Sequence, residues 1–279
     1  MRSAEVMAGA TSSAVHALVV EDASGRARRL VLRRYVDREW LGREPDLAEH
    51  EAHVLALLGP YPVPAPRLFG VDANGAEAGV PSVLMARLDG RPAVVGELTA
   101  RLGALAALLP QVHATSVPAW ARLRLYRPYY TGGIDPRESE LVPPPWSARP
   151  ELWERAIERH RAWTHPGAGV LLHRDYHPGN VLFVGGRLSG LVDWVNASIG
   201  PPDLDVGHLR ANLTGLLDLE AADDFRDRWM VEAGVDRYDP MADVLATVGL
   251  LPSWHPYFDG AEDRMEELVA RALAELGAP

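Results

Sequence analysis

The chain has 279 residues, 47% of them hydrophobic, so it can bury the core of one large domain or of two lobes. It has no cysteine, which excludes disulfides, thiolate nucleophiles and cysteine-bound metals, and no apolar run approaches the about 18 residues of a membrane span. The net charge is −10, and all 28 basic residues are arginine. Residues 200–279 hold 17 acidic residues against 6 arginines. This acidic region either attracts a cationic small molecule, since it repels nucleic acid, or serves only solubility.

The N-terminal ninety residues have the pattern of a small, mostly antiparallel sheet with one helix. The segments "AVHALVV" and "RRLVLRRYV" flank the turn-forming "EDASGRA" and predict a hairpin. A helix is expected from Asp46, a candidate N-cap, until the prolines of "YPVPAP" stop it. Two more strands follow in "PRLFGVD" and "VPSVLMARL". The start "MRSAEVMAGATSS" lacks the apolar core of a signal peptide, so we expect a cytoplasmic protein.

Beyond Gly90 the pattern becomes helical. Helices are predicted in "ELTARLGALAALL", "ELWERAIERHRAW", "LEAADDFRDRWMVEAG" and "AEDRMEELVARALAEL", the last with an apolar stripe typical of core packing. A second hairpin is expected around Gly185-Gly186. Residues 117–150 are rich in proline, arginine and aromatics, and a loop this long usually carries function or is disordered.

The stretch "HRDYHPGN", residues 173–180, concentrates polar chemistry directly after the apolar "VLL". One interpretation is a metal hydrolase with His173, Asp175 and His177 as ligands, but no second clustered motif supplies further ligands. The other is phosphoryl transfer. That chemistry needs an aspartate to accept a hydroxyl proton, an asparagine five residues later for Mg²⁺ and a second metal-binding aspartate, which Asp175, Asn180 and Asp193 supply.

These motifs carry a resemblance to a known family. "HRDYHPGNVLF" followed by "GLVDWVNASIGPPDLDVGHL" resembles the aminoglycoside phosphotransferase and choline kinase-like family, which is related to the protein kinases. The resemblance covers essentially the whole chain. It implies a bilobal α+β protein kinase-like fold with an N-terminal nucleotide-binding lobe, residues 1–88, and a mostly helical catalytic and substrate-binding lobe, residues 89–279.

The resemblance also implies residue roles in the second lobe. Asp175 would be the catalytic base, and Asn180 and Asp193 the Mg²⁺ ligands. His173 would organise the loop by hydrogen bonding, and Asp205 would brace it from the following helix. His177 stands where related kinases have a phosphate-contacting side chain, although a loop-shaping role fits it equally well.

In the first lobe the strand "LVLRR" places Arg33 where kinases have a lysine, with Arg34 on the opposite face. Arginine keeps a positive charge for the nucleotide phosphates. On the following helix, Glu51 falls within the apolar stripe of Leu47, Val54 and Leu58 while Glu49 points away. A carboxylate on a buried face needs a cation, so we predict an Arg33–Glu51 pair; the alternative is that Glu51 reaches solvent.

Two further segments are expected to contact the nucleotide. "MAGATSSAV" stands where the family has a glycine-containing turn, and its candidate phosphate donors are Gly9, Thr11, Ser12 and Ser13. "VLMARLDG" resembles the family's hinge, where backbone groups around Met85 and Arg87 would bind the adenine edge.

The sequence thus predicts a kinase that uses ATP or GTP with Mg²⁺. Asp203 follows Asp193 by only ten positions, which leaves no room for a protein-kinase activation loop, so we expect the acceptor to be a small molecule. A cationic antibiotic of aminoglycoside type is the leading acceptor; choline, sugars, homoserine, or nucleotide binding without transfer are the alternatives. Acidic residues that would recognise ammonium groups are Asp218, Glu220, Asp223, Asp259, Glu262 and Asp263.

Overall fold

The computed structural model describes residues 2–7, 13–118, 121–130, 141–253 and 260–277. Its contacts divide the chain into two compact units. Unit 1 comprises Met1–Arg91, Val117–Leu123 and Leu182–Ala197; unit 2 comprises Pro92–Ser116, Arg124–Val181 and Ser198–Pro279. The first unit therefore ends near the predicted lobe boundary, but it also includes the hairpin of residues 182–197, which the prediction placed in the second lobe.

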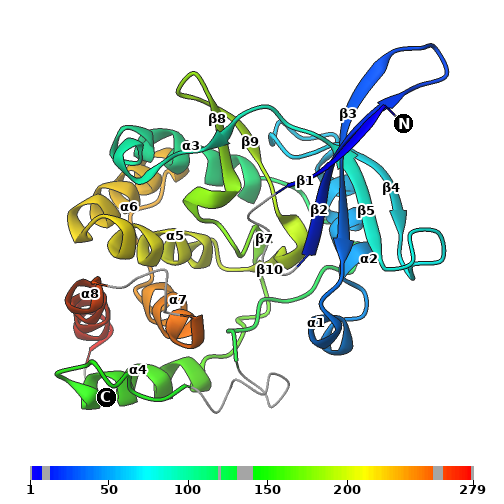
Figure 1. Ribbon diagram of the computed structural model, residues 1–279. Coiled ribbons are helices and arrows are strands. Elements are labelled where there is room, and N and C mark those ends of the chain that lie inside the picture. The colour runs from blue at the N-terminus through cyan, green and yellow to red at the C-terminus, as the bar shows by residue number, and fades with distance from the viewer. Residues whose placement is uncertain (1, 8–12, 119–120, 131–140, 254–259, 278–279) are drawn as a thin grey trace. The chain divides into compact units, whose positions relative to one another are not determined.

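Unit 1 is built on a five-stranded antiparallel sheet of order β1-β2-β3-β5-β4 (Figure 1). Its strands are β1 (Ser3–Val6), β2 (Ser13–Glu21), β3 (Ala27–Tyr35), β4 (Leu68–Asp72) and β5 (Ser82–Ala86). The β2–β3 register pairs Val15 with Arg33. Because side chains alternate between the two faces of a strand, Ser13, Arg33 and Tyr35 share one face, and Arg34 lies on the other.

Two helices join this sheet. The predicted helix is α2 (Leu47–Leu58), which buries its apolar residues and ends at Gly59. Asp46 occupies its N-cap position, but its side chain makes no capping hydrogen bond. The apolar pattern did not predict the short α1 (Arg38–Arg43), whose first turn is capped by Asp37, which accepts from the backbone N–H groups of residues 39 and 40.

The second predicted hairpin is also present. Strands β8 (Val181–Val184) and β9 (Arg187–Leu191) form a small sheet of order β6-β8-β9 with β6 (Arg91–Pro92). Gly185 and Gly186 connect β8 to β9 with φ angles of 55° and 80°, values that glycine adopts without steric cost. The 3₁₀ helix η6 (Trp194–Asn196) follows.

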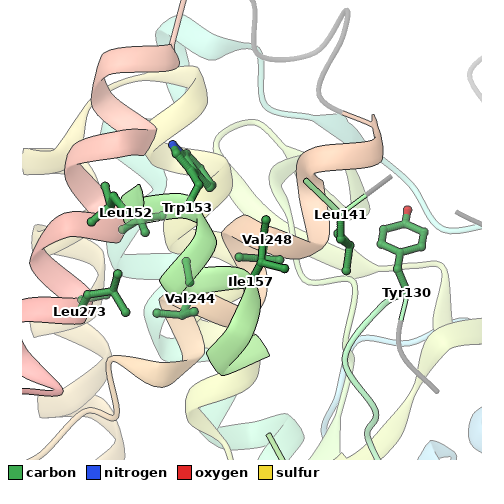
Figure 2. Packing of buried hydrophobic residues seen from close by; sticks show 11 residues of the cluster. Tyr130, Leu141, Leu152, Trp153, Ile157, Val244, Val248 and Leu273 are labelled. Carbon is green, nitrogen blue, oxygen red and sulfur yellow. The ribbon is translucent and has the colours of Figure 1, made fainter. Parts of the chain in front are cut away.

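Unit 2 is mostly helical. It contains α3 (Leu102–His113), α4 (Pro150–Ala162), α5 (Asp203–Leu216), α6 (Leu219–Ala233), α7 (Met241–Leu250) and α8 (Glu262–Glu275), with the paired strands β7 (Val170–Leu172) and β10 (Ser198–Gly200). Further 3₁₀ helices among the described residues are η1 (Val95–Glu97), η2 (Thr99–Arg101), η5 (Pro178–Asn180) and η7 (Leu251–Ser253). Figure 2 shows Trp153 and Ile157 of α4 packed with Val244 and Val248 of α7 and Leu273 of α8.

Helices α5 and α7 were absent from the helices predicted from apolar spacing. Both are buried on nearly all sides: of the ten residues of α7, eight are buried. Such a helix lacks a continuous polar face, so its sequence carries little amphipathic signal. In the described part of the chain, no helix has the length and apolar character that crossing a bilayer requires.

Candidate phosphoryl-transfer site

Arg33 and Glu51 form a buried ion pair in unit 1. Nη1 of Arg33, on β3, donates to Oε1 of Glu51, on α2, at 3.1 Å. Glu51 is 1% exposed and Arg33 is 6% exposed, so each charge has lost most of its water and needs its partner. Burial alone would lower the pKa of Arg33, but Glu51 and Asp193 outweigh it and hold that pKa above its usual range. The predicted pairing is therefore confirmed, whereas Glu49 is exposed.

Two neighbours from the same face of the sheet complete the surroundings of this pair. Nε of Arg33 donates to Oγ of Ser13 at 3.1 Å, and the guanidinium carbon lies 5.2 Å from the centre of the Tyr35 ring. The hydroxyl of Tyr35 donates to Oε2 of Glu51 at 2.6 Å. Burial and the charge of Glu51 raise the pKa of Tyr35, so it remains a donor. Arg34, on the other face, donates to the carbonyl oxygen of Ala78.

Asp193, also in unit 1, lies two residues after β9 at the N-cap position of η6, and its backbone is left-handed with φ 68°. This conformation is uncommon for a residue with a side chain and often marks functional positions. Nη1 of Arg33 donates to Oδ1 of Asp193 at 2.5 Å and Nη2 donates to Oδ2 at 3.3 Å. The planar fork of the guanidinium thus holds both carboxylate oxygens, which an ammonium group cannot do in the same way.

The expected nucleotide-contacting segments are only partly visible. Gly9, Thr11 and Ser12 lie outside the described residues, so Ser13 is the one member of that set with a described position. Met85 is buried on β5, and the backbone N–H of Arg87 donates to the carbonyl oxygen of Arg29 at 3.1 Å. The backbone N–H of Arg87 therefore already has an acceptor within unit 1 and is not free to bind the adenine edge.

In unit 2 the motif of residues 173–180 connects β7 to β8 and is anchored by α5. The backbone N–H groups of His173 and Arg174 donate to the two carboxylate oxygens of Asp205 at 2.9 and 2.7 Å. Asp205 is fully buried and also lies 3.0 Å from Nε2 of His113 on α3. The bracing contact expected of Asp205 is thus present.

The carboxylate of Asp175 is held from two sides. Its Oδ1 lies 3.3 Å from Nε2 of His208 on α5, and its Oδ2 accepts from Nδ2 of Asn180 at 3.3 Å. Nδ2 of Asn180 also donates to the carbonyl oxygen of Asp175. Burial tends to raise the pKa of Asp175, but the bond from His208 and the nearby His177 and His173 outweigh it and lower that pKa below its usual range.

The other two histidines of the motif shape the loop. Nδ1 of His177 accepts from the backbone N–H of Gly179 at 3.1 Å, and a side chain at position 179 would come within 2.7 Å of the His177 ring. Nε2 of His177 is 3.9 Å from Asp175, too far for a hydrogen bond. His173 is fully buried, with its ring 6.2 Å from that of Tyr176.

Arg174, the residue before Asp175, is held by two aromatic rings and a backbone carbonyl group. Its guanidinium lies 4.4 Å from the ring centre of Tyr129 and 5.4 Å from that of Tyr126, and Nη2 donates to the carbonyl oxygen of Arg127 at 2.8 Å. The irregular segment after Arg124 is therefore attached to the motif beside Asp175 by cation–π contacts.

The sequence analysis missed three residues that contact predicted site residues. Tyr35 contacts Glu51 in unit 1, and in unit 2 His113 contacts Asp205 and His208 contacts Asp175. For His208 a signal was available. It follows Asp205 by three positions, and residues three apart share one helix face. Nothing in the local sequence marks Tyr35 or His113, because their partners are distant in the chain.

Each unit, taken by itself, carries an oxygen donor of a kind that suits Mg²⁺. In unit 2 the amide nitrogen of Asn180 is directed at Asp175, which leaves its Oδ1 for a cation. In unit 1 Asp193 carries a carboxylate. Oxygen ligands of these two kinds are the ones that Mg²⁺ prefers. Across the described residues, no group of three or more histidine, aspartate and glutamate side chains is arranged to hold a metal ion. This gives the metal-hydrolase interpretation no support.

Some of the acidic residues predicted to recognise the acceptor already have partners within the protein. Asp218 caps α6 by accepting from the backbone N–H of Ala221, and Asp223 is paired with Arg210 and Arg226. Asp259 lies outside the described residues. The remaining candidates are Glu220, Glu262 and Asp263, of which Glu220 and Asp263 are exposed.

The sheet, the anchored motif and the paired Arg33 define a kinase-like phosphotransferase. Residues 10–243 match the model of the phosphotransferase enzyme family, so the chain belongs to this family. The protein YcbJ of Bacillus subtilis (strain 168), described as uncharacterized, is 36% identical over 56 residues, which are 20% of this chain and 18% of YcbJ.

Solved structures with the same fold include three antibiotic phosphotransferases. A thermostable mutant of aminoglycoside phosphotransferase APH(4)-Ia, in a ternary complex with ADP and hygromycin B, is 18% identical over 100% of this chain and 95% of its own, with a TM-score of 0.66. The macrolide 2'-phosphotransferase MphH from Brachybacterium faecium is 20% identical over 99% and 92%, with a TM-score of 0.56. Amicoumacin kinase hAmiN, in complex with AMP-PNP, Ca²⁺ and Ami, is 12% identical over 96% and 87%, with a TM-score of 0.59. The expected α+β kinase-like fold is confirmed.

Proposed function

We propose that this protein transfers the γ-phosphoryl group of ATP or GTP to a hydroxyl group of a small molecule, and that the acceptor is an antibiotic of aminoglycoside type. The observation that carries this proposal is the carboxylate of Asp175, which is held by His208 and Asn180 on a loop anchored by Asp205. The complexes of structural neighbours with ADP, AMP-PNP and hygromycin B support the choice of nucleotide and acceptor class.

Asp175 orients the acceptor hydroxyl and takes its proton. Because the transition state of phosphoryl transfer is loose, the base has to be ionised and correctly placed rather than strongly basic. The lowered pKa of Asp175, caused by His208 and the other nearby imidazoles against the effect of burial, keeps it ionised at neutral pH.

The nucleotide-binding residues are assigned within each unit separately. Asn180 in unit 2 and Asp193 in unit 1 would each offer an oxygen ligand to Mg²⁺, and the ion would supply positive charge to neutralise the phosphates. Arg33 contributes a fixed positive charge; it already makes four hydrogen bonds to described residues, so one of its five N–H groups remains for a phosphate oxygen. Since the N–H groups of Ala86 and Arg87 are engaged, we place the adenine contact on the carbonyl of Arg87 and the backbone of Leu88.

The proposal is tested by measuring ADP or GDP release with a panel of acceptors. The panel contains aminoglycosides, a macrolide, choline, homoserine and a neutral sugar, and each is assayed with ATP and with GTP in the presence of Mg²⁺. We expect turnover with at least one aminoglycoside and none with the Asp175→Ala variant. Turnover of only choline, homoserine or the sugar would identify a metabolite kinase instead. Nucleotide binding without turnover of any acceptor would contradict the transfer activity.

A further inference from the structure

Three consecutive residues of the motif are bound by two side chains of a single helix. Asp205 of α5 accepts from the backbone N–H groups of His173 and Arg174, and His208 of α5 contacts the carboxylate of Asp175. Asp205 and His208 are three positions apart and therefore lie on the same face of α5. Asp205 fixes the backbone of the motif, and His208 contacts the side chain that follows.

The contact defines the protonation of one ring nitrogen. An ionised carboxylate can only accept hydrogen bonds, so Nε2 of His208 has to carry a proton to bond Oδ1 of Asp175 at 3.3 Å. The side chain of His208 is 12% exposed, which limits competition from water. Asn180 donates to the other oxygen, Oδ2. With one donor on each oxygen, the carboxylate plane of Asp175 cannot rotate freely, and each oxygen keeps a lone pair for an acceptor hydroxyl.

We propose that His208 is a positioning residue, which orients the carboxylate of Asp175 toward the acceptor hydroxyl through its Nε2–H. This inference rests on the proposed phosphotransferase function, because it assigns Asp175 the role of base. His208 itself does not touch the nucleotide or the acceptor.

His177, the other imidazole next to Oδ1, does not fill this role. Its Nε2 is 3.9 Å from the carboxylate, and its Nδ1 is used to accept from Gly179. The two rings lie 6.4 Å apart, so they approach Asp175 from separate positions. His173 is buried against Tyr176 and contributes its backbone. Of His177 and His208, it is His208 whose Nε2 lies within hydrogen-bond distance of Oδ1.

The kinetic test compares His208→Phe with His208→Gln. Phenylalanine keeps a ring but removes the donor, and glutamine keeps a donor without a ring. We expect His208→Phe to lower kcat about 10- to 100-fold, the scale expected when a reacting group is misplaced, with the KM for the nucleotide unchanged. His208→Gln should recover most of kcat. His53→Phe, at an exposed position on α2, is the matched control and should behave like the wild type.

A split between kcat and nucleotide KM, with recovery by glutamine, separates positioning from a merely structural role. A structural role would lower the melting temperature of both variants and leave the kcat of the folded fraction unchanged. Wild-type kcat in folded His208→Phe would overturn the proposal, and so would a glutamine variant as slow as the phenylalanine variant. If His208→Phe does not fold, His208→Gln and the spectroscopic experiment decide.

A spectroscopic experiment needs no acceptor. In protein labelled with ¹⁵N-histidine, the His208 resonances, assigned with His208→Gln, should show a protonated Nε2, and Asp175→Ala should shift them. The ring signals of His165, which bonds the carbonyl of Ile199, should not move. Insensitivity of His208 to Asp175→Ala would overturn the contact. If the acceptor panel fails, the proposed function fails, while this experiment still reports on His208 and Asp175.

Discussion

At the scale of single residues, Asp175 shows how several weak contacts define one reactive group. Its carboxylate receives one donor on each oxygen, from His208 and Asn180, and the backbone just before it is held by Asp205. None of these contacts changes the chemistry of a carboxylate. Together they keep it ionised and limit its orientations, which is what loose phosphoryl transfer requires of a base.

Asp175→Asn should lower kcat by about 10² to 10⁴, because asparagine keeps the size of the side chain but cannot accept the proton. The KM for the nucleotide should change little, since the loss is confined to the transition state. Steady-state kinetics with a saturating acceptor measures both constants. Asp236→Asn, at an exposed position, is the control. An unchanged kcat would remove Asp175 from the mechanism.

Arg33→Ala should lower the free energy of unfolding by about 3 kcal/mol, because Glu51 would remain buried without its cation. The KM for the nucleotide should also rise. Urea unfolding and steady-state kinetics measure the two effects, and Arg34→Ala, on the opposite face of β3, is the control. Arg33→Lys should retain charge but lose the fork to Asp193, so we expect partial activity.

The stability and kinetic arms of this experiment test different statements. An Arg33→Ala variant with the wild-type urea midpoint would show that the pair with Glu51 contributes nothing. A variant that is destabilised but keeps the wild-type KM would show that the nucleotide phosphates are held by other groups.

At the scale of elements, α5 connects the hydrophobic core of unit 2 to the motif. The helix is buried along most of its length, and Asp205 and His208 near its start reach the motif. Gly207 lies between them. At this point α5 approaches α7 so closely that a Cβ on Gly207 would be 2.5 Å from the backbone of Ala242. Glycine is therefore required here by the distance between two helices.

Gly207→Ala should lower the free energy of unfolding by about 1 to 3 kcal/mol, the usual cost of overpacking a core. It should also lower kcat, because α5 has to move and takes Asp205 and His208 with it. Gly103→Ala on α3 is the control: its nearest neighbour is the end of the Arg228 side chain at 3.7 Å, so alanine fits. Urea unfolding and kinetics that find equal effects for the two variants would contradict the close packing of α5 on α7.

At the scale of the whole molecule, the absence of lysine and cysteine makes tyrosine the only side chain that titrates between about pH 9 and pH 12. Five of the eight tyrosines have a raised pKa because of burial: Tyr35, Tyr126, Tyr129, Tyr176 and Tyr238. Stability at high pH is therefore governed by these residues.

The free energy of unfolding should fall as the pH rises above about 10. Burial raises the pKa of Tyr126 to about 12, whereas in the unfolded chain it ionises near 10. Between these values the unfolded state has lost the proton and the folded state has not, so each pH unit costs about 1.4 kcal/mol for this residue. Urea unfolding at pH 9 and at about pH 11 measures the loss, which Tyr126→Phe should reduce. Equal midpoints at the two pH values would contradict it.

The acidic C-terminal part leads to a prediction about association. If residues 200–279, with a net charge of −11, attract a cationic acceptor, its kcat/KM should fall steeply as ionic strength rises. A neutral acceptor assayed in parallel should show no such fall, because screening acts on the charge of the substrate. If kcat/KM falls equally with ionic strength for both acceptors, the acidic residues of this region do not attract the acceptor.

The sequence by itself determined the fold class and the members of the site that lie in continuous motifs. Two aliphatic and β-branched segments flanking a turn-forming connection predicted the hairpin that carries Arg33, and helical spacing selected Glu51 over Glu49. Asp175 and Asn180 were identified by their spacing of five residues, Asp193 by its place after the second hairpin, and Asp205 by the resemblance to the family. The hairpin and the Arg33–Glu51 pair could be predicted because strand and helix periods are local properties of the chain, whereas the catalytic and metal-binding roles stay predictions.

Only the tertiary structure decided which side chains, distant in the sequence, contact the predicted site residues. His208 reaches Asp175 across 33 positions, and Tyr35 bonds Glu51 across 16. The helix α5, which presents His208, is buried on nearly all sides and so has no amphipathic pattern to reveal it. The bidentate contact between Arg33 and Asp193 spans 160 positions and exists because unit 1 includes the hairpin of residues 182–197. Such contacts depend on how separate elements pack, which no local period encodes.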